Sequence, residues 1–401
     1  LGDVYKRQVL MSALESLEPL LRFLPEIPKP SRRLSLTERL MWTGVVLIIY
    51  LVMSQVPLYG IPWQQRGLET LQFIRIIMAS KRGTLMELGI GPLVTSGLIW
   101  QLLVGSKIIQ LDLTTSKGRA LFTGLEKLFA ILFTFLQAAI YVSGGYYGAL
   151  TLDKQFIVFI QLSTATILVL LMDEMLQKGW GLGSGVSLFI AAGVAQQIFW
   201  QLFAPIKVAD ELPLGVIPAL VTTIWLGFTQ GAWEKIGYML SRPGYPSLLG
   251  FIAMVVFFII LLYLENVSIE IPIGLSRYGS IRSKIPLKFL YVSNIPIILV
   301  SALLADLHIF SQIAWYKLNI NKESWIYQYF MKYIIDYNTT ANPPQPMPGT
   351  LLYYLSPPRG ISDIYQDPLK VLVYSLFLIG FSVLFSICLL YTSDAADDGE
   401  S

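Results

Sequence analysis

Apolar stretches of about twenty residues recur along the chain, separated by shorter polar or charged segments. A helix needs about 20 consecutive apolar residues to cross the hydrocarbon core of a bilayer. Eight stretches approach that length, so the pattern predicts an all-α polytopic membrane protein with eight spans. The predicted spans are Met41–Tyr59, Met86–Val104, Leu128–Tyr147, Phe156–Met175, Val186–Phe203, Leu248–Leu264, Phe289–Phe310 and Val371–Leu389.

Two further apolar segments are not predicted to span. Ser12–Glu26 is too short and too charged, but its leucines form a helical stripe, which is typical of a helix lying at the membrane interface. Leu212–Gly227 is short and carries Pro213 and Pro218. We interpret it as an external interfacial segment, because counting it as a span would invert every later helix.

Basic residues indicate the orientation of the spans, since cytoplasmic loops carry an excess of Lys and Arg. With eight spans and a cytoplasmic N-terminus, the basic loops all fall on one side. These loops carry Arg32, Arg33, Arg39, Lys107, Lys117, Arg119, Lys178, Arg277, Arg282, Lys284 and Lys288. The long loop Ser311–Lys370 is then external, and we expect it to fold onto the outer ends of the helices.

Composition narrows the possible chemistry. The chain is 54% hydrophobic and 14% charged, against about 25% charged residues in soluble domains. Its formal charge of +3 is too small to indicate nucleic acid. One Cys, Cys388, excludes an internal disulfide or a cysteine metal cluster, and one His, His308, argues against a histidine metal site or relay. We therefore expect no enzyme, no metal and no cofactor.

Helix-breaking residues interrupt three of the predicted spans, at Gly89–Pro92, Trp180–Gly185 and Ser293–Pro296. Freed backbone groups are tolerated in a membrane where protein or a water-filled cavity satisfies them, so three breaks suggest a shared cavity. Close helix packing on small residues is the alternative. The Gly-x-Gly-x-Gly run at 181–185 lacks the spacing and the preceding strand of a phosphate-binding loop.

Ionisable residues within the spans are few. Asp306 lies deep in the seventh predicted span, where such a group is costly and usually functional. The alternative is a carboxylate that reaches the external interface near His308. Glu126–Lys127 and Asp173–Glu174 fall at predicted membrane borders, and we interpret them as solvated helix ends.

Several long, ordered segments resemble the SecY family of protein translocase channels, in its archaeal and eukaryotic form. They are Glu87–Ile109, Gly183–Gly193, Pro286–Leu299, Tyr353–Pro358 and Asp367–Pro368. The resemblance runs from Met11 to Ser386 and implies two pseudo-symmetric helix halves. The family has ten spans, so the resemblance implies a C-terminally truncated chain that lacks the ninth and tenth.

The resemblance also implies a division of the chain. Both ends are polar or acidic and resemble translated adapter sequence, so we interpret them as sequencing artefacts. The expected parts are 1–10, an artefact; 11–40, a cytoplasmic or interfacial helix; 41–203, the first half, with a plug at 70–80; 204–247, an external connection; 248–388, the partial second half; and 389–401, a second artefact.

The family function implied is a passive channel that conducts unfolded polypeptide across the membrane and releases apolar segments sideways into lipid. Position by position, its aliphatic pore ring matches Ile90, Val94, Val186, Ile190 and Ile298. Without the resemblance these positions would be interpreted as packed core. The plug matches Leu71, Phe73, Ile74, Ile76 and Ile77, and nearby Arg75 suggests an edge facing water.

The lateral gate of the family lies between spans two and three and spans seven and eight. Its polar contact matches Thr95, Gln137 and Asp306. The relatives usually carry an amide at the third position, so an acid there makes gate strength depend on protonation. The hypothesis that follows is that Asp306→Asn strengthens closure.

Partners are implied in the same way. The loop with Arg277, Arg282 and Lys284 matches the ribosome-binding loop, and its charge suits ribosomal RNA phosphates, although the orientation rule alone also explains it. A SecE-type gamma subunit, a small beta subunit, a nascent polypeptide with its signal sequence and membrane lipid complete the expected partners. The expected location is an archaeal plasma membrane.

Three other functions remain as alternatives. A secondary transporter also has broken helices, but it usually needs several polar ligands at the midplane. A membrane enzyme would need acid, base or metal groups in one pocket. A structural scaffold would not need the Gly-Pro breaks.

Overall fold

We analysed a computed structural model of the chain. It describes residues 18–21, 23–61, 75, 78–105, 108–109, 111, 115–143, 147, 150–207, 212–231, 234–240, 242, 245–274, 282–288, 295–318, 325, 327–338, 345–358 and 366–397.

A helix lies at each of the eight predicted spans. These helices are α3 (Leu36–Met53), α5 (Gly91–Gly105), α6 (Ser116–Ser143), α7 (Leu152–Met175), α8 (Gly185–Phe203), α11 (Leu248–Asn266), α12 (Ile295–Leu318) and α16 (Pro368–Asp397). Within the described residues, six helices are long and apolar enough to cross a membrane, while α5 and the Pro296–Gln312 part of α12 are apolar but shorter. The fold class predicted from the sequence is confirmed.

The remaining elements are short. The helical ones are α2 (Glu18–Leu21), η2 (Leu176–Trp180), α9 (Val216–Gln230), α10 (Glu234–Leu240), η3 (Tyr327–Met331), α13 (Lys332–Ile334) and α14 (Leu351–Tyr354). Two antiparallel hairpins join β1 (Ser268–Gly274) to β2 (Arg282–Lys288) and β3 (Tyr337–Asn338) to β4 (Gln345–Pro346).

Most boundaries differ by several residues from the predicted ones, and three of the differences have a clear local reason. The second span begins as a helix at Gly91 rather than at Met86, because Gly89 takes a left-handed φ of +57° and Pro92 suits a first helical turn. In the predicted interfacial segment, helix α2 ends at Leu21 instead of reaching Glu26. Prolines at positions 25, 28 and 30 follow it and do not favour a continued helix. Helix α16 runs on to Asp397, past Leu389, because no Gly or Pro interrupts 381–397.

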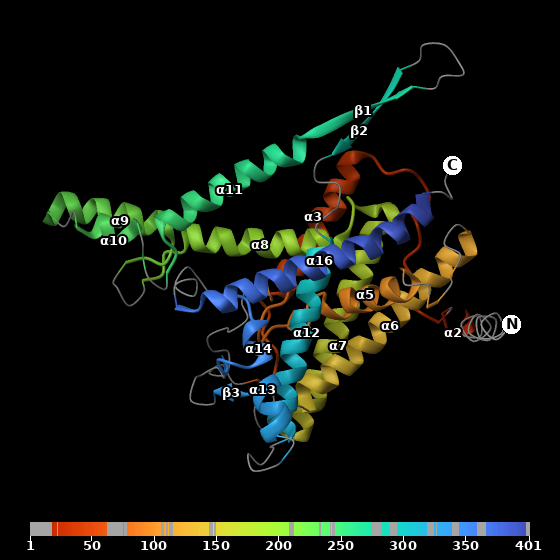
Figure 1. The fold of residues 1–401 in the computed structure, drawn as a ribbon, viewed down its shortest axis with the longest axis horizontal. Coiled ribbons are helices and arrows are strands. Elements are labelled where there is room, and N and C mark those ends of the chain that lie inside the picture. The colour runs from red at the N-terminus through yellow and green to blue at the C-terminus, as the bar shows by residue number, and fades with distance from the viewer. Residues whose placement is uncertain are drawn as a thin grey trace. The chain divides into compact units, whose positions relative to one another are not determined.

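The chain divides into two compact units, residues 1–192 with 294–401, and residues 193–293. In the first unit, α5 packs against α6, α12 and α16, and α6 packs against α7 (Figure 1). The largest apolar cluster of this unit draws on α3, α5, α7, α12 and α16. The second unit contains α9, α10 and α11. No side chain of α11 is buried, as suits an apolar helix surrounded by lipid.

Candidate functional site

Three polar side chains from three helices meet at Asp306 of α12. The Thr95 hydroxyl of α5 donates a hydrogen bond to Asp306 Oδ2 over 2.6 Å, and Gln137 Nε2 of α6 donates to Oδ1 over 3.1 Å. Both donors are neutral, so among the described residues the carboxylate is held by hydrogen bonds rather than by an ion pair. These contacts join α12 to α5 and α6, and the functional role of Asp306 stays a prediction.

His308, two residues further along α12, makes separate contacts. Its side chain is buried, and Nε2 lies 3.3 Å from the carbonyl oxygen of Leu355. The Tyr337 hydroxyl donates to the His308 carbonyl oxygen over 3.4 Å. The long loop after α12 therefore folds back onto that helix, as the sequence predicted, although α12 itself continues to Leu318 before the loop begins.

The five residues matched to a pore ring lie in one apolar cluster. Ile90 and Val94 are buried in it, and Val186, Ile190 and Ile298 pack against it. Ile90 directly precedes α5 and Val94 lies in its first turn, while the other three come from α8 and α12. The structure thus brings together side chains that are more than 200 positions apart in the sequence.

Gly89 explains how the chain reaches this cluster. The Ile90 amide donates to the Met78 carbonyl over 3.0 Å, and a Cβ on Gly89 would lie 2.3 Å from that same carbonyl oxygen. Met78 and Ala79 are themselves buried in the cluster. Only a glycine lets the two backbone segments approach this closely.

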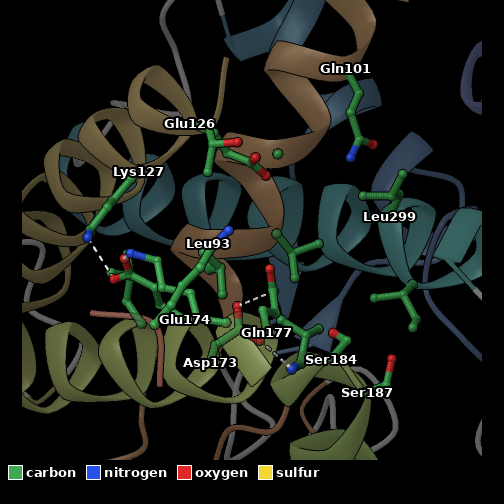
Figure 2. Close-up of a pocket in the computed structure, with 18 residues that line it drawn as sticks. Leu93, Gln101, Glu126, Lys127, Asp173, Glu174, Gln177, Ser184, Ser187 and Leu299 are labelled. Atoms are coloured by element: carbon green, nitrogen blue, oxygen red, sulfur yellow. Dashed lines mark hydrogen bonds and ion pairs between the residues drawn. The ribbon is translucent and has the colours of Figure 1, made fainter. Parts of the chain in front are cut away.

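A cavity of about 490 Å³ lies beside the ring positions, and its lining includes Val94, Val186 and Ile298. Figure 2 shows polar side chains on its walls, among them Gln101, Glu126, Lys127, Asp173 and Glu174. Of the three predicted breaks, Trp180–Gly185 contributes Ser184 to this lining, while Leu93 and Ile298 lie just after the other two. A cavity shared by all three breaks stays a prediction. No group of three His, Cys, Asp or Glu side chains suited to a metal is found among the described residues.

The interpretation of Asp173–Glu174 and Glu126–Lys127 as solvated helix ends is wrong. Asp173 is buried, and its Oδ1 accepts a hydrogen bond from the Val186 amide at the start of α8 over 3.0 Å. Glu174 pairs with Lys127 at 2.7 Å and with Lys178 at 2.9 Å. The loop between α7 and α8 folds back, and this brings the side chains together.

Gly181 and Gly185, two glycines of the Gly-x-Gly-x-Gly run, belong to this fold-back. A Cβ on Gly185 would lie 2.7 Å from Asp173 Cα, and one on Gly181 would lie 2.1 Å from a Leu176 methyl carbon. Close packing, against the Asp173 backbone at Gly185 and against the Leu176 side chain at Gly181, explains these two positions without phosphate binding.

The predicted plug residues Leu71, Phe73, Ile74, Ile76 and Ile77 lie outside the described residues. Arg75 is described, and the expectation that it faces water is wrong: its side chain is 13% exposed and pairs with buried Glu87 at 2.9 Å. Glu87 also accepts a hydrogen bond from the Gly83 amide. A buried arginine needs such a partner.

The predicted ribosome-binding residues fall on or beside a β-hairpin. Arg282 and Lys284 lie on β2, where they pair with Gly274 and Pro272 of β1. Arg277 lies outside the described residues.

Sequence reasoning did not single out Glu87 and Gln101. The signal for Glu87 was available, since an acid two positions before the Gly-x-Gly-Pro break needs a cation and Arg75 stands twelve positions earlier. Gln101 offers no such signal, because only the packing of α5 places it on the cavity wall.

The fold and these clusters define a class: a polytopic helical membrane protein whose broken helices bring an aliphatic cluster together beside a cavity. A sequence profile described as SecY matches residues 84–398, and one described as the plug domain of Sec61p matches residues 48–83. The chain belongs to the SecY family.

Individual relatives agree with this assignment. The protein translocase subunit SecY of Aeropyrum pernix is 41% identical over 369 residues, which cover 90% of this chain and 73% of the relative. A solved structure of a protein-conducting channel has a TM-score of 0.71 at 33% identity, covering 94% of this chain and 77% of that one. Sec61 in the canine ribosome–channel complex from the endoplasmic reticulum has a TM-score of 0.69 at 33% identity, covering 93% and 77%.

These relatives are channel subunits, which favours the channel over the transporter and scaffold alternatives. The chain is a multi-pass protein of the cell membrane.

Proposed function

We propose that the chain is the pore-forming subunit of a Sec translocation channel that acts without catalysis. It conducts unfolded secretory polypeptides and releases apolar segments into lipid. The observation that carries this proposal is the convergence of Ile90, Val94, Val186, Ile190 and Ile298 in one apolar cluster next to a cavity. Aliphatic side chains make a constriction that excludes water and ions and forms no lasting hydrogen bonds with a passing chain.

The plug and the gate complete the proposed machinery. Residues 70–80 act as the plug, and the match of 48–83 to the plug domain of Sec61p supports this. The gate lies between α5 and α6 on one side and α12 and α16 on the other, with Thr95, Gln137 and Asp306 as its polar contact. Opening requires those two hydrogen bonds to break.

The proposed partners follow from the family. Relatives have been solved in complexes with ribosomes, including canine Sec61 and the yeast Ssh1 complex on the 80S ribosome. The β1–β2 hairpin, with Arg277, Arg282 and Lys284, is the proposed ribosome contact. A SecE-type gamma subunit, a small beta subunit, a nascent polypeptide and lipid are the other partners, in an archaeal plasma membrane.

Ion leakage through the purified channel in liposomes tests the ring. Ile190→Asn places an amide in the constriction, so hydration rises and we expect ion conductance to increase about tenfold. Ile190→Leu is the matched control and should leave conductance unchanged. Equal conductance of the two variants would mean that Ile190 is ordinary packed core.

A further inference from the structure

Two side chains on the wall of the 490 Å³ cavity, Glu126 and Gln101, have acceptor oxygens that meet no donor among the described residues. The carboxylate of Glu126, on α6, makes no hydrogen bond or ion pair in the described part of the chain, although it is partly buried. It lies against α5, because a Cβ on Gly97 would come within 2.7 Å of Glu126 Oε1. On α5, the side-chain oxygen of Gln101 is buried and also lacks a donor.

Lys127, Lys178, Asp173 and Glu174, which also line this cavity, already make ion pairs or hydrogen bonds. Lys127 pairs with Glu174 at 2.7 Å, and Lys178 pairs with Glu26 at 2.6 Å and with Glu174 at 2.9 Å. Asp173 accepts hydrogen bonds from Gln177 Nε2 and from the Val186 amide. None of these groups forms an ion pair or a hydrogen bond with the Glu126 carboxylate.

Lys29 is the remaining cation of the lining. Its side chain is exposed, so solvent and salt screen its charge from Glu126. The cavity therefore keeps an acidic character at the wall formed by α5 and α6.

Apolar residues make up much of the remaining lining, together with the hydroxyl side chains of Thr123, Ser184 and Ser187. Leu93, Val94, Leu170, Val186, Ile298 and Leu299 face the same space. A volume of about 490 Å³ falls within the range of roughly 300–1,000 Å³ typical of ligand pockets. It accommodates a few side chains rather than a folded domain. A fitting occupant carries hydrogen-bond donors with a positive charge next to an apolar segment.

We propose that this cavity receives the positively charged amino-terminal flank of an entering apolar segment, held by Glu126 and Gln101. An ammonium offers three donors and a guanidinium five, which suits two unmatched acceptors. Secretory signals consist of a positive segment followed by 7–15 apolar residues, which can lie against the apolar lining. The proposal rests on the channel function proposed above and names the feature of the substrate that this site selects.

Translocation of paired substrates tests the selection. The substrates are identical except for two lysines or two glutamines before the apolar segment, and the channel is reconstituted with its partner subunits. We expect the lysine form to cross faster in the native chain. Glu126→Gln removes the charge at constant shape, and this advantage should fall about three- to tenfold, since charged hydrogen bonds are stronger than neutral ones.

Asp153→Asn is the matched control, because it removes one carboxylate from the exposed first turn of α7, away from the cavity lining. It should retain the full advantage of the lysine substrate. If Glu126→Gln retains it too, the inference is wrong while the channel function stands. If neither substrate crosses in the native chain, the proposed function itself fails.

A cross-link in the native chain decides the matter without a variant. A carbodiimide joins a carboxyl to an adjacent lysine amine as an amide and takes up the elements of water as a urea. With the translocation substrate stalled in the channel, we expect its flanking lysine to be joined to Glu126, as identified by mass spectrometry. Cross-links confined to other carboxylates, or no cross-links at all, would overturn the assignment. A parallel reaction with soluble lysine in place of the substrate shows how readily Glu126 couples to any free amine.

Discussion

At the scale of single residues, close backbone approaches and buried polar contacts decide the architecture around the ring. Gly89 allows the Met78 carbonyl to reach the Ile90 amide, and Asp306 holds α12 to two other helices. The roles of Gly89 and Asp306 do not follow from their hydrophobicity, although hydrophobicity dominates the sequence pattern. Each makes a testable difference.

Gly89→Ala should destabilise the protein by at least about 1–2 kcal/mol, because a left-handed backbone is costly for alanine and its Cβ would clash with the Met78 carbonyl. Thermal unfolding in detergent measures this. Gly380→Ala is the matched control: nothing lies within 4 Å of its Cβ, and it sits inside α16, where alanine is favoured. Gly380→Ala should be neutral or slightly stabilising.

Asp306→Asn should strengthen closure of the proposed gate. The amide keeps hydrogen-bonding capacity toward Thr95 and Gln137 but removes the cost of a buried charge. We expect weakly apolar signals to be translocated several-fold less well, as measured with a hydrophobicity series. Asp306→Leu, which removes both hydrogen bonds, should act in the opposite direction, and unchanged stringency in Asp306→Asn would contradict the hypothesis.

At the scale of elements, the described helices lie where hydropathy predicted them, but their starts depend on contacts. Helix α8 begins at Gly185 because Asp173 of α7 caps the Val186 amide, thirteen positions away. Hydropathy predicts a span from the run of apolar residues alone, so it found α8 but not the cap. The same limit made Asp173 look like a solvated helix end.

The β1–β2 hairpin carries the next prediction. Arg282→Glu with Lys284→Glu should weaken ribosome binding about tenfold or more at low salt, because two phosphate contacts become repulsive. Cosedimentation over a salt series measures this. Lys154→Glu, at the exposed start of α7 on the side predicted to be external, is the control and should not alter binding.

At the scale of the whole molecule, contacts between distant parts of the sequence tie the N-terminal segment to α6 and η2. Lys178 pairs with Glu26, Trp180 Nε1 donates to the Pro28 carbonyl, and Lys127 donates to the Pro25 carbonyl. The hydrogen bond from Lys178 lowers the pKa of Glu26 below its usual 4.5. This segment is therefore held partly by charge.

The pH dependence of that attachment follows from the sign of the shift. Because the folded-state pKa of Glu26 is lowered, its contribution is complete above pH 4.5 and is lost as the pH falls through the lower folded value. Glu26 is largely exposed, so the loss should be below about 1 kcal/mol. Hydrogen exchange of residues 23–34 should increase on acidification in the native chain relative to Glu26→Gln, in which the pair is absent throughout.

The sequence by itself determined that the chain spans the membrane repeatedly and where its spans lie, because twenty apolar residues must be buried in lipid whatever their neighbours are. Its motifs also identified the family. Only the tertiary structure decided which polar groups are satisfied: Arg75 by Glu87, Asp173 by α8, and the Glu126 carboxylate by no group in the part of the chain that the structure describes. These outcomes depend on side chains that are distant in sequence and adjacent in space, and local hydropathy carries no information about such pairs.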